Sequence, residues 1–509
     1  MARLKEYNGH YCESEYEYAF IGFLEAEGWK YSSGNNIYRV TKRDVLIADD
    51  FKKFIADTNL DLTEDEVIQI YDNVRLVGAE SDFATLHKVY GWMVNGVQFT
   101  PQDGLPRMIP LIEFDNWDKN IFRVVNQFTV EYTNNGQKEN RRPDVLLFVN
   151  GIPLCVIELK NPADANATIY DAWEQINIRY WRDIPHLLHY CPLACISDGV
   201  KTRLGTVRTP YEHFYAWRRV NEGDVVSTLP FAETETMIKG VYTPERFVEI
   251  FRDYIYFQDS IYDCDEVEIV CRYPQFFAAK LLKQSIVNSV VTRSGKGGTY
   301  FGATGCGKTY TMAFLARQLA LRCTDIPEIG SPTIILIVDR DELQKQGSKL
   351  FTKSKEFLNL GEVSVVKNRT QLRQELVARQ SGGFYICTIQ KFCDREDDKI
   401  GLINDRQNII CFSDEAHRTQ LEHSKKIQFS KDADENMKAM VSKPYAKVLK
   451  EAFPHATFVG FTGTPIAETY QTFGDEIDRY TMDQAVADGL TVSIKYHPRI
   501  AKVLLDNKK

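Results

Sequence analysis

The sequence predicts an α/β protein with more than one domain. Its 509 residues exceed what a single hydrophobic core usually organises. After a helical N-terminal stretch, strand-like runs rich in β-branched and aromatic residues begin near residue 109. A glycine-rich loop at residues 302–309 is then followed by buried strands alternating with helices, which is typical of a parallel sheet. We expect one domain at 1–250, a second at 251–470, and a linker into a further domain at 471–509.

The composition is that of an ordinary soluble protein with a small excess of acidic residues. Hydrophobic residues make up 44% and charged residues 26%, and the formal net charge is −8. Any nucleic-acid surface must therefore be a local groove, because overall electrostatic attraction is absent. The 11 cysteines lack zinc-ligand spacing, which favours buried, reduced thiols. No secretory signal opens the chain and no apolar run approaches the roughly 18 residues of a membrane span, so we expect a cytoplasmic protein without a membrane partner.

The most specific motif is a phosphate-binding loop that fits G-x-x-x-x-G-K-[ST] at every fixed position. Its candidate nucleotide-binding residues are Gly302, Thr304, Gly305, Gly307, Lys308 and Thr309. Glycines let backbone N–H groups approach phosphate oxygens, and the positive end of the following helix faces the same anion. Lys308 is expected to contact the β- and γ-phosphates, and the Thr309 hydroxyl is expected to ligate Mg2+. The spacing favours ATP with Mg2+ over a glycine-rich turn that binds no nucleotide.

A pair of adjacent acids, Asp414 and Glu415, follows a later buried strand at residues 408–412. In ATPases such a pair stands at the carboxyl edge of the sheet, beside the phosphate loop. Asp414 would hold Mg2+ through water, and Glu415 would orient and deprotonate the attacking water. Asp-Glu pairs also occur in plain surface turns, but the loop upstream favours the catalytic interpretation.

A second cluster of charged residues lies in the strand-rich region, in the pattern P-D-(x13)-E-x-K. Its members are Asp144, Glu158 and Lys160. Glu158 and Lys160 share a strand face because they are two residues apart. A two-residue hairpin loop at 150–151 would place the two carboxylates on opposite faces, whereas a three-residue loop at 149–151 would place them on one face. We predict the three-residue loop, with its glycine in the left-handed conformation.

Two carboxylates on one face can hold Mg2+, which polarises a phosphodiester and lowers the pKa of a bound water. A nearby lysine can orient that water or stabilise the charge that develops on phosphorus. Alone the pattern is a weak signal, because charged residues at strand ends usually form a solvated face. Its neighbours in the sequence strengthen the interpretation as a nuclease site.

Four segments of this region resemble one known family. They are residues 111–115, 125–130, 142–144 and 156–162. The family is the restriction and translocation (HsdR) subunit of type I restriction–modification enzymes, whose N-terminal domain is a PD-(D/E)xK nuclease. The resemblance implies that Asp144 and Glu158 are metal ligands and that Lys160 is the catalytic lysine. Glu15, on the first helix, matches an acidic position that often completes such a metal site.

The helix after the nuclease strand often carries the pattern Q-x-x-x-Y in that family. Here Gln175 is followed by Tyr180 five residues later, and Arg179 stands at the expected place of the tyrosine. Gln175 remains a candidate catalytic-site residue, with a surface glutamine as the alternative. The altered spacing leaves the role of Tyr180 open.

The second half of the chain resembles the motor of the same family. The acids at 414–415 begin the sequence D-E-A-H-R-T-Q, and F-T-G-T-P follows at 461–465. Arg272-Tyr-Pro-Gln275 resembles the adenine-reading element of DEAD/DEAH-type helicases, so Arg272 and Gln275 are expected to contact the nucleotide. The resemblance implies a RecA-like superfamily 2 helicase domain, with residues 475–509 as the linker and opening strand of a second one. We expect a fragment that binds ATP weakly and does not translocate alone.

The resemblance further implies ATP-dependent movement of double-stranded DNA coupled to Mg2+-dependent cleavage of unmodified DNA. The partners would be DNA and the modification (methyltransferase) and specificity subunits. Two alternatives stay open at this stage. One is a helicase of another, type III-like defence system whose nuclease domain is inactive and structural. The other is a docking module without enzymatic activity.

Overall fold

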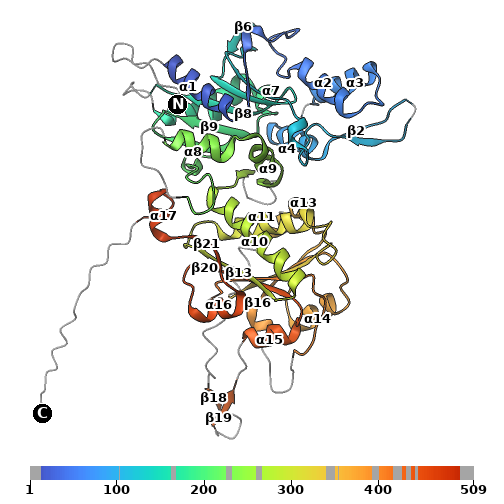
Figure 1. Ribbon diagram of the computed structural model, residues 1–509, viewed down its shortest axis with the longest axis vertical. Helices are drawn as coiled ribbons and strands as arrows, with labels where there is room; N and C mark the ends of the chain where they lie inside the picture. The colour runs from blue at the N-terminus through green and yellow to red at the C-terminus, as the bar shows by residue number, and fades with distance from the viewer. Residues whose placement is uncertain are drawn as a thin grey trace, which may run out of the picture.

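The computed structural model describes residues 13–492 with gaps, and it contains two large β-sheets with helices packed around them (Figure 1). The gaps are residues 79, 103, 162–167, 225–231, 259–265, 340–349, 354, 393–399, 417–426, 432–436 and 442–444. We call residues 13–253 the first domain and residues 273–488 the second domain. Among the described residues, no helix combines the length and the apolar character needed to cross a membrane.

The first domain is built on a six-stranded sheet that contains both parallel and antiparallel pairs. Across the sheet, the strands are β1 (Lys30–Ser33), β4 (Phe122–Asn126), β7 (Val145–Val149), β8 (Ile152–Leu159), β9 (Leu193–Ser197) and β10 (Thr202–Thr206). Every residue of β7 and β8 is buried. The near-continuous apolar sequences of these two central strands reflect a sheet that is covered on both faces.

Helices and short strand pairs surround this sheet. The longer helices are α1 (Glu13–Ala26), α2 (Ala48–Thr58), α3 (Glu64–Arg75), α4 (Asp82–Asn95), α8 (Ala232–Val241) and α9 (Pro244–Asp253). The shorter ones are α5 (Ile169–Glu174), η3 (Gln175–Tyr180), α6 (Trp181–Asp183) and α7 (Pro185–Leu188), together with the 3-10 turns η1 (Gly34–Asn36), η2 (Trp117–Lys119) and η4 (Tyr211–His213). The short strand pairs are β2 (Val97–Phe99) with β3 (Arg107–Ile109) and β5 (Val130–Asn134) with β6 (Gln137–Arg141). Helix α1 contacts both β4 and β8.

The hairpin between β7 and β8 turns differently from the prediction. Val149 pairs with Ile152, so the loop contains two residues, Asn150 and Gly151, and the predicted three-residue loop is wrong. Both loop residues have positive φ, 51° and 76°, which is the backbone twist that a tight two-residue hairpin requires. A Cβ atom on Gly151 would lie 2.2 Å from the carbonyl oxygen of Ile47, so only glycine fits this turn.

A β-bulge in the same hairpin nevertheless brings the two acids onto one face. The register shifts by one residue between Leu147 and Phe148, and beyond the shift Val145 pairs with Ile157. The next position outward on each strand is Asp144 and Glu158, so the register places them opposite one another. A two-residue hairpin without the bulge would have put these carboxylates on opposite faces.

The second domain is built on a seven-stranded sheet in which every pair of neighbours is parallel. Across the sheet, the strands are β15 (Val363–Val365), β16 (Phe384–Thr388), β14 (Thr333–Val338), β17 (Ile409–Asp414), β20 (Thr457–Thr462), β13 (Lys296–Gly302) and β21 (Glu476–Tyr480). The helices include α10 (Tyr273–Thr292), α11 (Lys308–Arg322), α13 (Lys355–Leu358), α14 (Arg369–Val377), α15 (Tyr445–Ala452), α16 (Ala467–Phe473) and α17 (Met482–Ala487), with the turn η5 (Ile389–Phe392). A separate pair, β18 (Ile427–Lys431) and β19 (Met437–Val441), completes the strands.

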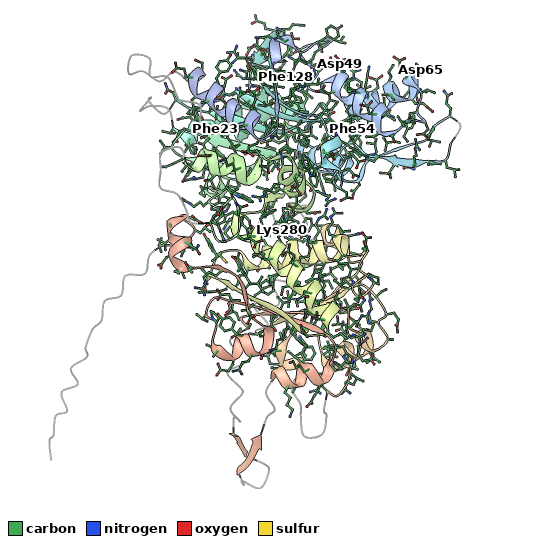
Figure 2. The ribbon with its side chains drawn as sticks, viewed as in Figure 1. Phe23, Asp49, Phe54, Asp65, Phe128 and Lys280 are labelled. Carbon is green, nitrogen blue, oxygen red and sulfur yellow. The ribbon has the colours of Figure 1, made fainter. Side chains whose placement is uncertain are left out.

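The two domains share one hydrophobic core. A single cluster of buried apolar residues extends from α1 through α9 to α10 and α11. The ribbon of β11 (Ile255–Gln258) and β12 (Val267–Val270) lies between the sheets in sequence, and β12 contacts β10. Lys280 of α10, at the junction, pairs with Glu249 of α9 at 3.0 Å (Figure 2).

The domain boundaries expected at residues 250 and 470 both fall within the packed structure. Residue 250 lies inside α9, which packs against both η2 of the first domain and α11 of the second. Strand β21 pairs in parallel with β13, so the second sheet extends past the boundary that was expected at residue 470. Residues 493–509, where a further domain was expected to open, lie outside the described residues.

Candidate functional site

Three charged residues of the first domain converge where β7 begins and β8 ends. Asp144 directly precedes β7. Glu158 is the last residue but one of β8, and Lys160 directly follows that strand. The Oδ2 atom of Asp144 accepts a hydrogen bond of 2.8 Å from the backbone N–H of Leu159. The Nζ atom of Lys160 lies 3.9 Å from the Oε2 atom of Glu158. The three side chains therefore gather at one end of the central hairpin.

Glu158 is a fully buried carboxyl group, with 0% of its surface exposed. Burial, followed by the negative charge of Asp144, raises its pKa well above the ordinary range, while the charge of Lys160 acts in the opposite direction. Among the described residues, its Oε2 atom has no hydrogen-bond partner. A buried oxygen without a hydrogen bond is costly, and a divalent cation closer than the Lys160 ammonium, which lies 3.9 Å away, would offset that cost.

The donor set suits a divalent cation that prefers oxygen. Mg2+ is usually held by one or two carboxylates, and water or phosphate oxygens fill its remaining positions. No group of three or more His, Cys, Asp or Glu side chains forms a ready metal cage within the described part of the chain. Asp144 and Glu158 would thus be the two protein carboxylates at an open site.

Gln175 and Tyr180 join the same cluster through a π-helical turn. Residues Gln175–Tyr180 form η3, a turn in which residues five apart stand one above the other. The Nε2 atom of Gln175 donates to the Tyr180 hydroxyl at 2.8 Å, and that hydroxyl donates to Oε1 of Glu158 at 2.5 Å. Lys160 Nζ donates to Oε1 of Gln175 at 3.1 Å. The π turn explains the five-residue spacing, and it gives Tyr180 the place that sequence left open.

The acidic residue that helix α1 brings toward this cluster is Glu17, which the sequence analysis missed. Its side chain is 7% exposed, and its Oε1 atom accepts hydrogen bonds from Asn126 at 2.6 Å and from Gln127 at 3.4 Å. Burial raises its pKa, and the negative charge of Asp144 adds to the shift. Glu17 therefore lies within electrostatic reach of the carboxylate cluster.

Glu15, the acid predicted from the resemblance, is half-buried on the same helix and stays a prediction. The signal that could have found Glu17 was the buried side of α1. Phe20 and Leu24 are fully buried on this side, whereas Phe23 is 38% exposed (Figure 2). Glu17 lies three residues before Phe20 and seven residues before Leu24, so it is an acid on the apolar stripe of the helix.

The glycine-rich loop connects β13 to α11 at the carboxyl edge of the parallel sheet. Gly305 and Gly307 have φ of 82° and 86°, a conformation that side chains with a Cβ atom rarely adopt. The Nζ atom of Lys308 donates to the carbonyl of Gly302 at 3.1 Å, so this side chain folds back over the loop. Thr304 is exposed and Thr309 is half-buried. The N-terminus of the 15-residue helix α11 borders the loop, as in anion-binding loops.

Asp414 ends β17 at the same edge of the sheet. Burial and the charge of Glu415 raise the pKa of Asp414 to about 6, while the positive charge of Lys308 opposes the shift. Glu415 has a φ of 49°, and its backbone N–H donates to Oδ1 of Asp414 at 3.0 Å. A non-glycine residue with positive φ is strained, and such strain is common at functional sites. His417, the fourth residue of the D-E-A-H motif, lies outside the described residues.

Arg272 and Gln275 line a cavity of about 380 Å³ beside the glycine-rich loop. Gln275 accepts a hydrogen bond of 2.9 Å from the backbone N–H of Arg272 and donates one of 3.3 Å to the carbonyl of Gly307. The Arg272 guanidinium lies 3.7 Å from the ring centre of Tyr215, a residue of the first domain, and Tyr310 also lines the cavity. Aromatic faces next to an amide and a guanidinium suit a flat heteroaromatic base. No motif in the sequence indicated that Tyr215 and Tyr310 would line this cavity.

Family models match both domains. Residues 11–213 match the type I restriction enzyme R protein N terminus (HSDR_N), and residues 274–509 match the SWI2/SNF2 ATPases. The chain thus joins an HSDR_N domain to an ATPase domain of the SWI2/SNF2 class, which agrees with the positions of the two sites.

Curated relatives extend this likeness across the chain. It is 30% identical over 522 residues to the type I restriction enzyme HindI endonuclease subunit of Haemophilus influenzae, covering 98% of this chain and 47% of that protein. It is 25% identical over 404 residues to the SauCOLORF180P endonuclease subunit of Staphylococcus aureus, covering 76% of this chain and 38% of that protein. The solved structure of the ATP-dependent type ISP restriction-modification enzyme LlaBIII bound to DNA aligns with 16% identity and a TM-score of 0.29, over 47% of this chain and 17% of that one.

The chain is a relative of the endonuclease subunits of type I restriction enzymes, the family whose motifs it carries. It spans less than half the length of either curated relative.

Proposed function

We propose that this chain carries the nuclease and part of the motor of a type I restriction enzyme, which moves double-stranded DNA with ATP and cuts unmodified DNA with Mg2+. One observation carries the proposal: Asp144, Glu158 and Lys160 converge at the end of a buried hairpin, and one oxygen of Glu158 has no hydrogen-bond partner among the described residues. Translocation is proposed for the whole protein, because the chain spans 47% of its relative from Haemophilus influenzae.

The nuclease is proposed to be of the PD-(D/E)xK type. Asp144 and Glu158 would hold Mg2+, which supplies polarisation of the scissile phosphate and a lower pKa for a bound water. Lys160 would stabilise the charge that develops on phosphorus. Gln175 holds the Lys160 ammonium and Tyr180 holds one oxygen of Glu158, so both groups are oriented before the substrate arrives.

The second domain is proposed to be a RecA-like ATPase. The backbone of the loop at 302–309 and the Lys308 ammonium would bind the phosphates, while Thr309 and Asp414 would hold Mg2+. Glu415 would take a proton from the attacking water. Arg272 and Gln275 would contact the base in the cavity that they line. The phosphate loop and the acids share one sheet edge, which supports this assignment.

The proposed partners are double-stranded DNA and the modification and specificity subunits of a type I complex. The curated relatives are endonuclease subunits, a name that implies such companions. DNA recognition would reside outside this chain. Its formal charge of −8 leaves DNA contact to local grooves.

Two substitutions in the reconstituted full-length complex test the proposal. Asp144→Ala should lower DNA cleavage by at least about a hundredfold and leave DNA-stimulated ATP hydrolysis intact, because it removes a metal ligand of the nuclease alone. Lys308→Ala should abolish ATP hydrolysis while the subunits still assemble. Asp57→Ala, which removes an exposed acid paired only with Lys53 of the same helix among the residues described, is the matched control.

The alternatives predict different results. Unchanged cleavage by the Asp144→Ala complex would reject the nuclease assignment and favour a structural domain. Unchanged ATP hydrolysis by the Lys308→Ala complex would reject the nucleotide site.

A further inference from the structure

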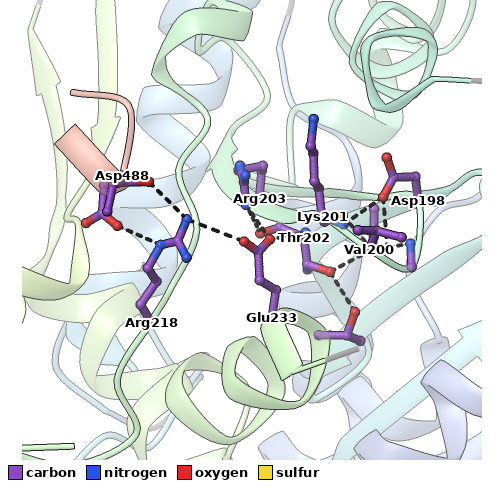
Figure 3. Close-up of polar contacts among 12 residues, drawn as sticks. Asp198, Val200, Lys201, Thr202, Arg203, Arg218, Glu233 and Asp488 are labelled. Atoms are coloured by element: carbon purple, nitrogen blue, oxygen red, sulfur yellow. Dashed lines mark hydrogen bonds and ion pairs between the residues drawn. The ribbon is translucent and has the colours of Figure 1, made fainter. Parts of the chain in front are cut away.

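Two adjacent arginines of the first domain hold the segment by which the chain leaves the second sheet. Arg218 Nε lies 2.6 Å from Oδ1 of Asp488, and Arg219 forms an ion pair of 3.2 Å with Asp478 of β21 (Figure 3 shows the first of these). All four side chains are mostly buried, with exposed fractions of 19%, 9%, 7% and 10%. Removing one partner of a buried ion pair leaves an uncompensated buried charge, so such a pair holds its two segments together. An exposed ion pair contributes little to stability.

The arginines are anchored to the first sheet. Tyr215, three residues before Arg218, exchanges two backbone hydrogen bonds of 2.9 and 3.0 Å with Leu204 of β10. The NH2 group of Arg218 also lies 3.5 Å from Oε1 of Glu233 on α8 and donates to the carbonyl of Ala487 at 3.4 Å. Arg218 therefore bridges the first domain and the end of α17.

On the side of the second domain, Asp488 is held by two further groups. Its Oδ2 atom accepts hydrogen bonds of 2.7 Å from the hydroxyls of Tyr273 and Tyr480. Tyr273 begins α10 and is followed two residues later by Gln275, which contacts the glycine-rich loop at Gly307. The acid thus joins the exit strand β21 to the helix that borders the proposed nucleotide site.

On the side of the first domain, the contacts continue to the nuclease cluster. Oε2 of Glu233 accepts from the backbone N–H of Thr202 at 3.1 Å (Figure 3). The Thr202 hydroxyl lies 2.7 Å from that of Ser197, and the Ser197 carbonyl accepts from the backbone N–H of Lys160 at 2.8 Å. A continuous series of polar contacts therefore connects Asp488 with the backbone of Lys160.

We propose that Arg218 is a positioning residue that couples the exit segment of the motor, residues 476–488, to the strand end that carries Lys160. A displacement of Asp488 moves Arg218, and Arg218 transmits it through Glu233 to β9 and β10. The part of this inference that concerns nucleotide rests on the proposed function. The mechanical part, from Asp488 to Lys160, does not depend on it.

Hydrogen–deuterium exchange of the 509-residue chain tests the mechanical part without nucleotide. Asp488→Asn removes the charge but keeps an acceptor for the tyrosines, and Arg218→Gln removes the other partner. Each should speed exchange of the peptides around Lys160 and Thr202 by about tenfold, because local opening becomes easier. The double variant should change them no further, because both substitutions break one pathway.

Lys239→Gln is the matched control, since Lys239 forms an exposed pair with Glu235 on the same helix as Glu233. The retained protection of the core strand β14 checks that each variant remains folded. Arg218→Lys keeps the charge and should restore part of the protection. Unchanged exchange near Lys160 in folded Asp488→Asn, or effects of the two substitutions that simply add, would overturn the inference.

A second arm uses the slowly hydrolysed analogue ATPγS with Mg2+. In the wild-type chain, the analogue should protect the loop 302–309 from exchange and should also change the exchange rate near Lys160. In Arg218→Gln, the loop should still be protected, but the exchange rate near Lys160 should no longer change. The coupling would be overturned if Arg218→Gln showed protection at the loop and still showed the wild-type change in exchange rate near Lys160. Absent protection at the loop would reject the nucleotide site instead, and the first arm would still decide the coupling.

Discussion

The nuclease cluster and the nucleotide site both contain a carboxyl group of raised pKa, yet they are built in opposite ways. Glu158 is enclosed by side chains that bond to one another, from Tyr180 through Gln175 to Lys160. Asp414 lies at a sheet edge beside a loop that is proposed to bind phosphate mainly through backbone groups. The first site is proposed to hold a cation between side chains that already bond to one another, whereas the second is proposed to be completed by a bound nucleotide.

The largest effect that separates the sites is expected for Glu158→Gln. Cleavage by the full complex should fall at least about a hundredfold, because a proposed metal ligand becomes neutral. The metal-free chain should nevertheless become more stable at pH 8, because a neutral amide replaces a fully buried carboxyl group whose pKa is raised well above its ordinary range. Chemical denaturation with and without Mg2+ measures this.

The pH dependence of the folding stability follows from the difference in Glu158 pKa between the folded and unfolded chains. The folded chain binds the Glu158 proton more tightly than the unfolded chain, so its stabilising contribution is complete below the unfolded pKa and is lost as pH rises through the folded pKa. The stability difference between variant and wild type should therefore grow with pH. Glu174→Gln, at an acid paired with Arg179 near the surface, is the control. A variant less stable than wild type at pH 8 without Mg2+ would contradict this account of the cluster.

Asp414→Asn should reveal the corresponding effect at the nucleotide site. Its pKa rises from 3.8 to about 6, so the metal-free wild type should lose about 3 kcal/mol of stability as pH increases across that interval. The variant should lack this part of the pH dependence. Denaturation curves at pH 4 and pH 7 without Mg2+ compare the two proteins. Equal pH slopes in both would show that Asp414 is not the group responsible.

Tyr180→Phe sharpens the comparison, because it removes one hydroxyl from the nuclease cluster and touches nothing at the nucleotide site. We expect cleavage to fall about tenfold, since Glu158 loses the hydrogen bond that orients it. Cleavage rates at saturating ATP measure this, with Tyr170→Phe, at a 46% exposed ring on the preceding helix, as the control. ATP hydrolysis should not change. Equal cleavage by both variants would reject a positioning role for Tyr180.

The smallest effect is expected from the two acids of α1. Glu17→Gln should lower cleavage by a few fold, about threefold, because Glu17 lies within electrostatic reach of Asp144 without bonding to it in the described contacts. Glu15→Gln should leave cleavage unchanged if Glu17 is the acid that serves the site. The ratio of cleavage rates for the two variants is the measurement. A larger loss for Glu15→Gln would restore the original assignment.

The sequence predicted the elements that have strong local signals. The buried strands expected after the glycine-rich loop include Thr333–Val338 and Phe384–Thr388, which are recognisable because a buried parallel strand has a continuous apolar sequence. The helix α9 begins at Pro244, in the first helical position that proline favours. The phosphate loop was found because its glycines and its lysine stand at fixed spacing.

The misses occurred where geometry depends on local irregularity or on contacts distant in sequence. The bulge in β8 that compensates for the two-residue loop has no residue signature, and neither has the π turn that aligns Gln175 with Tyr180. Strand β21 joins its sheet beside β13, and this pairing could not be read from residues 476–480 alone. The contribution of Tyr215 to the cavity arises only because the two domains pack together.

The most direct test of the account is calorimetric titration of the chain with Mn2+, as a stand-in for Mg2+, at pH 7.5 without nucleotide. We predict one binding event that Asp144→Ala abolishes and Asp414→Asn leaves intact, because the side chains of the nuclease cluster already hold one another in place, whereas the proposed metal site at Asp414 also needs the nucleotide. Binding that survives Asp144→Ala, or that disappears with Asp414→Asn, would contradict it.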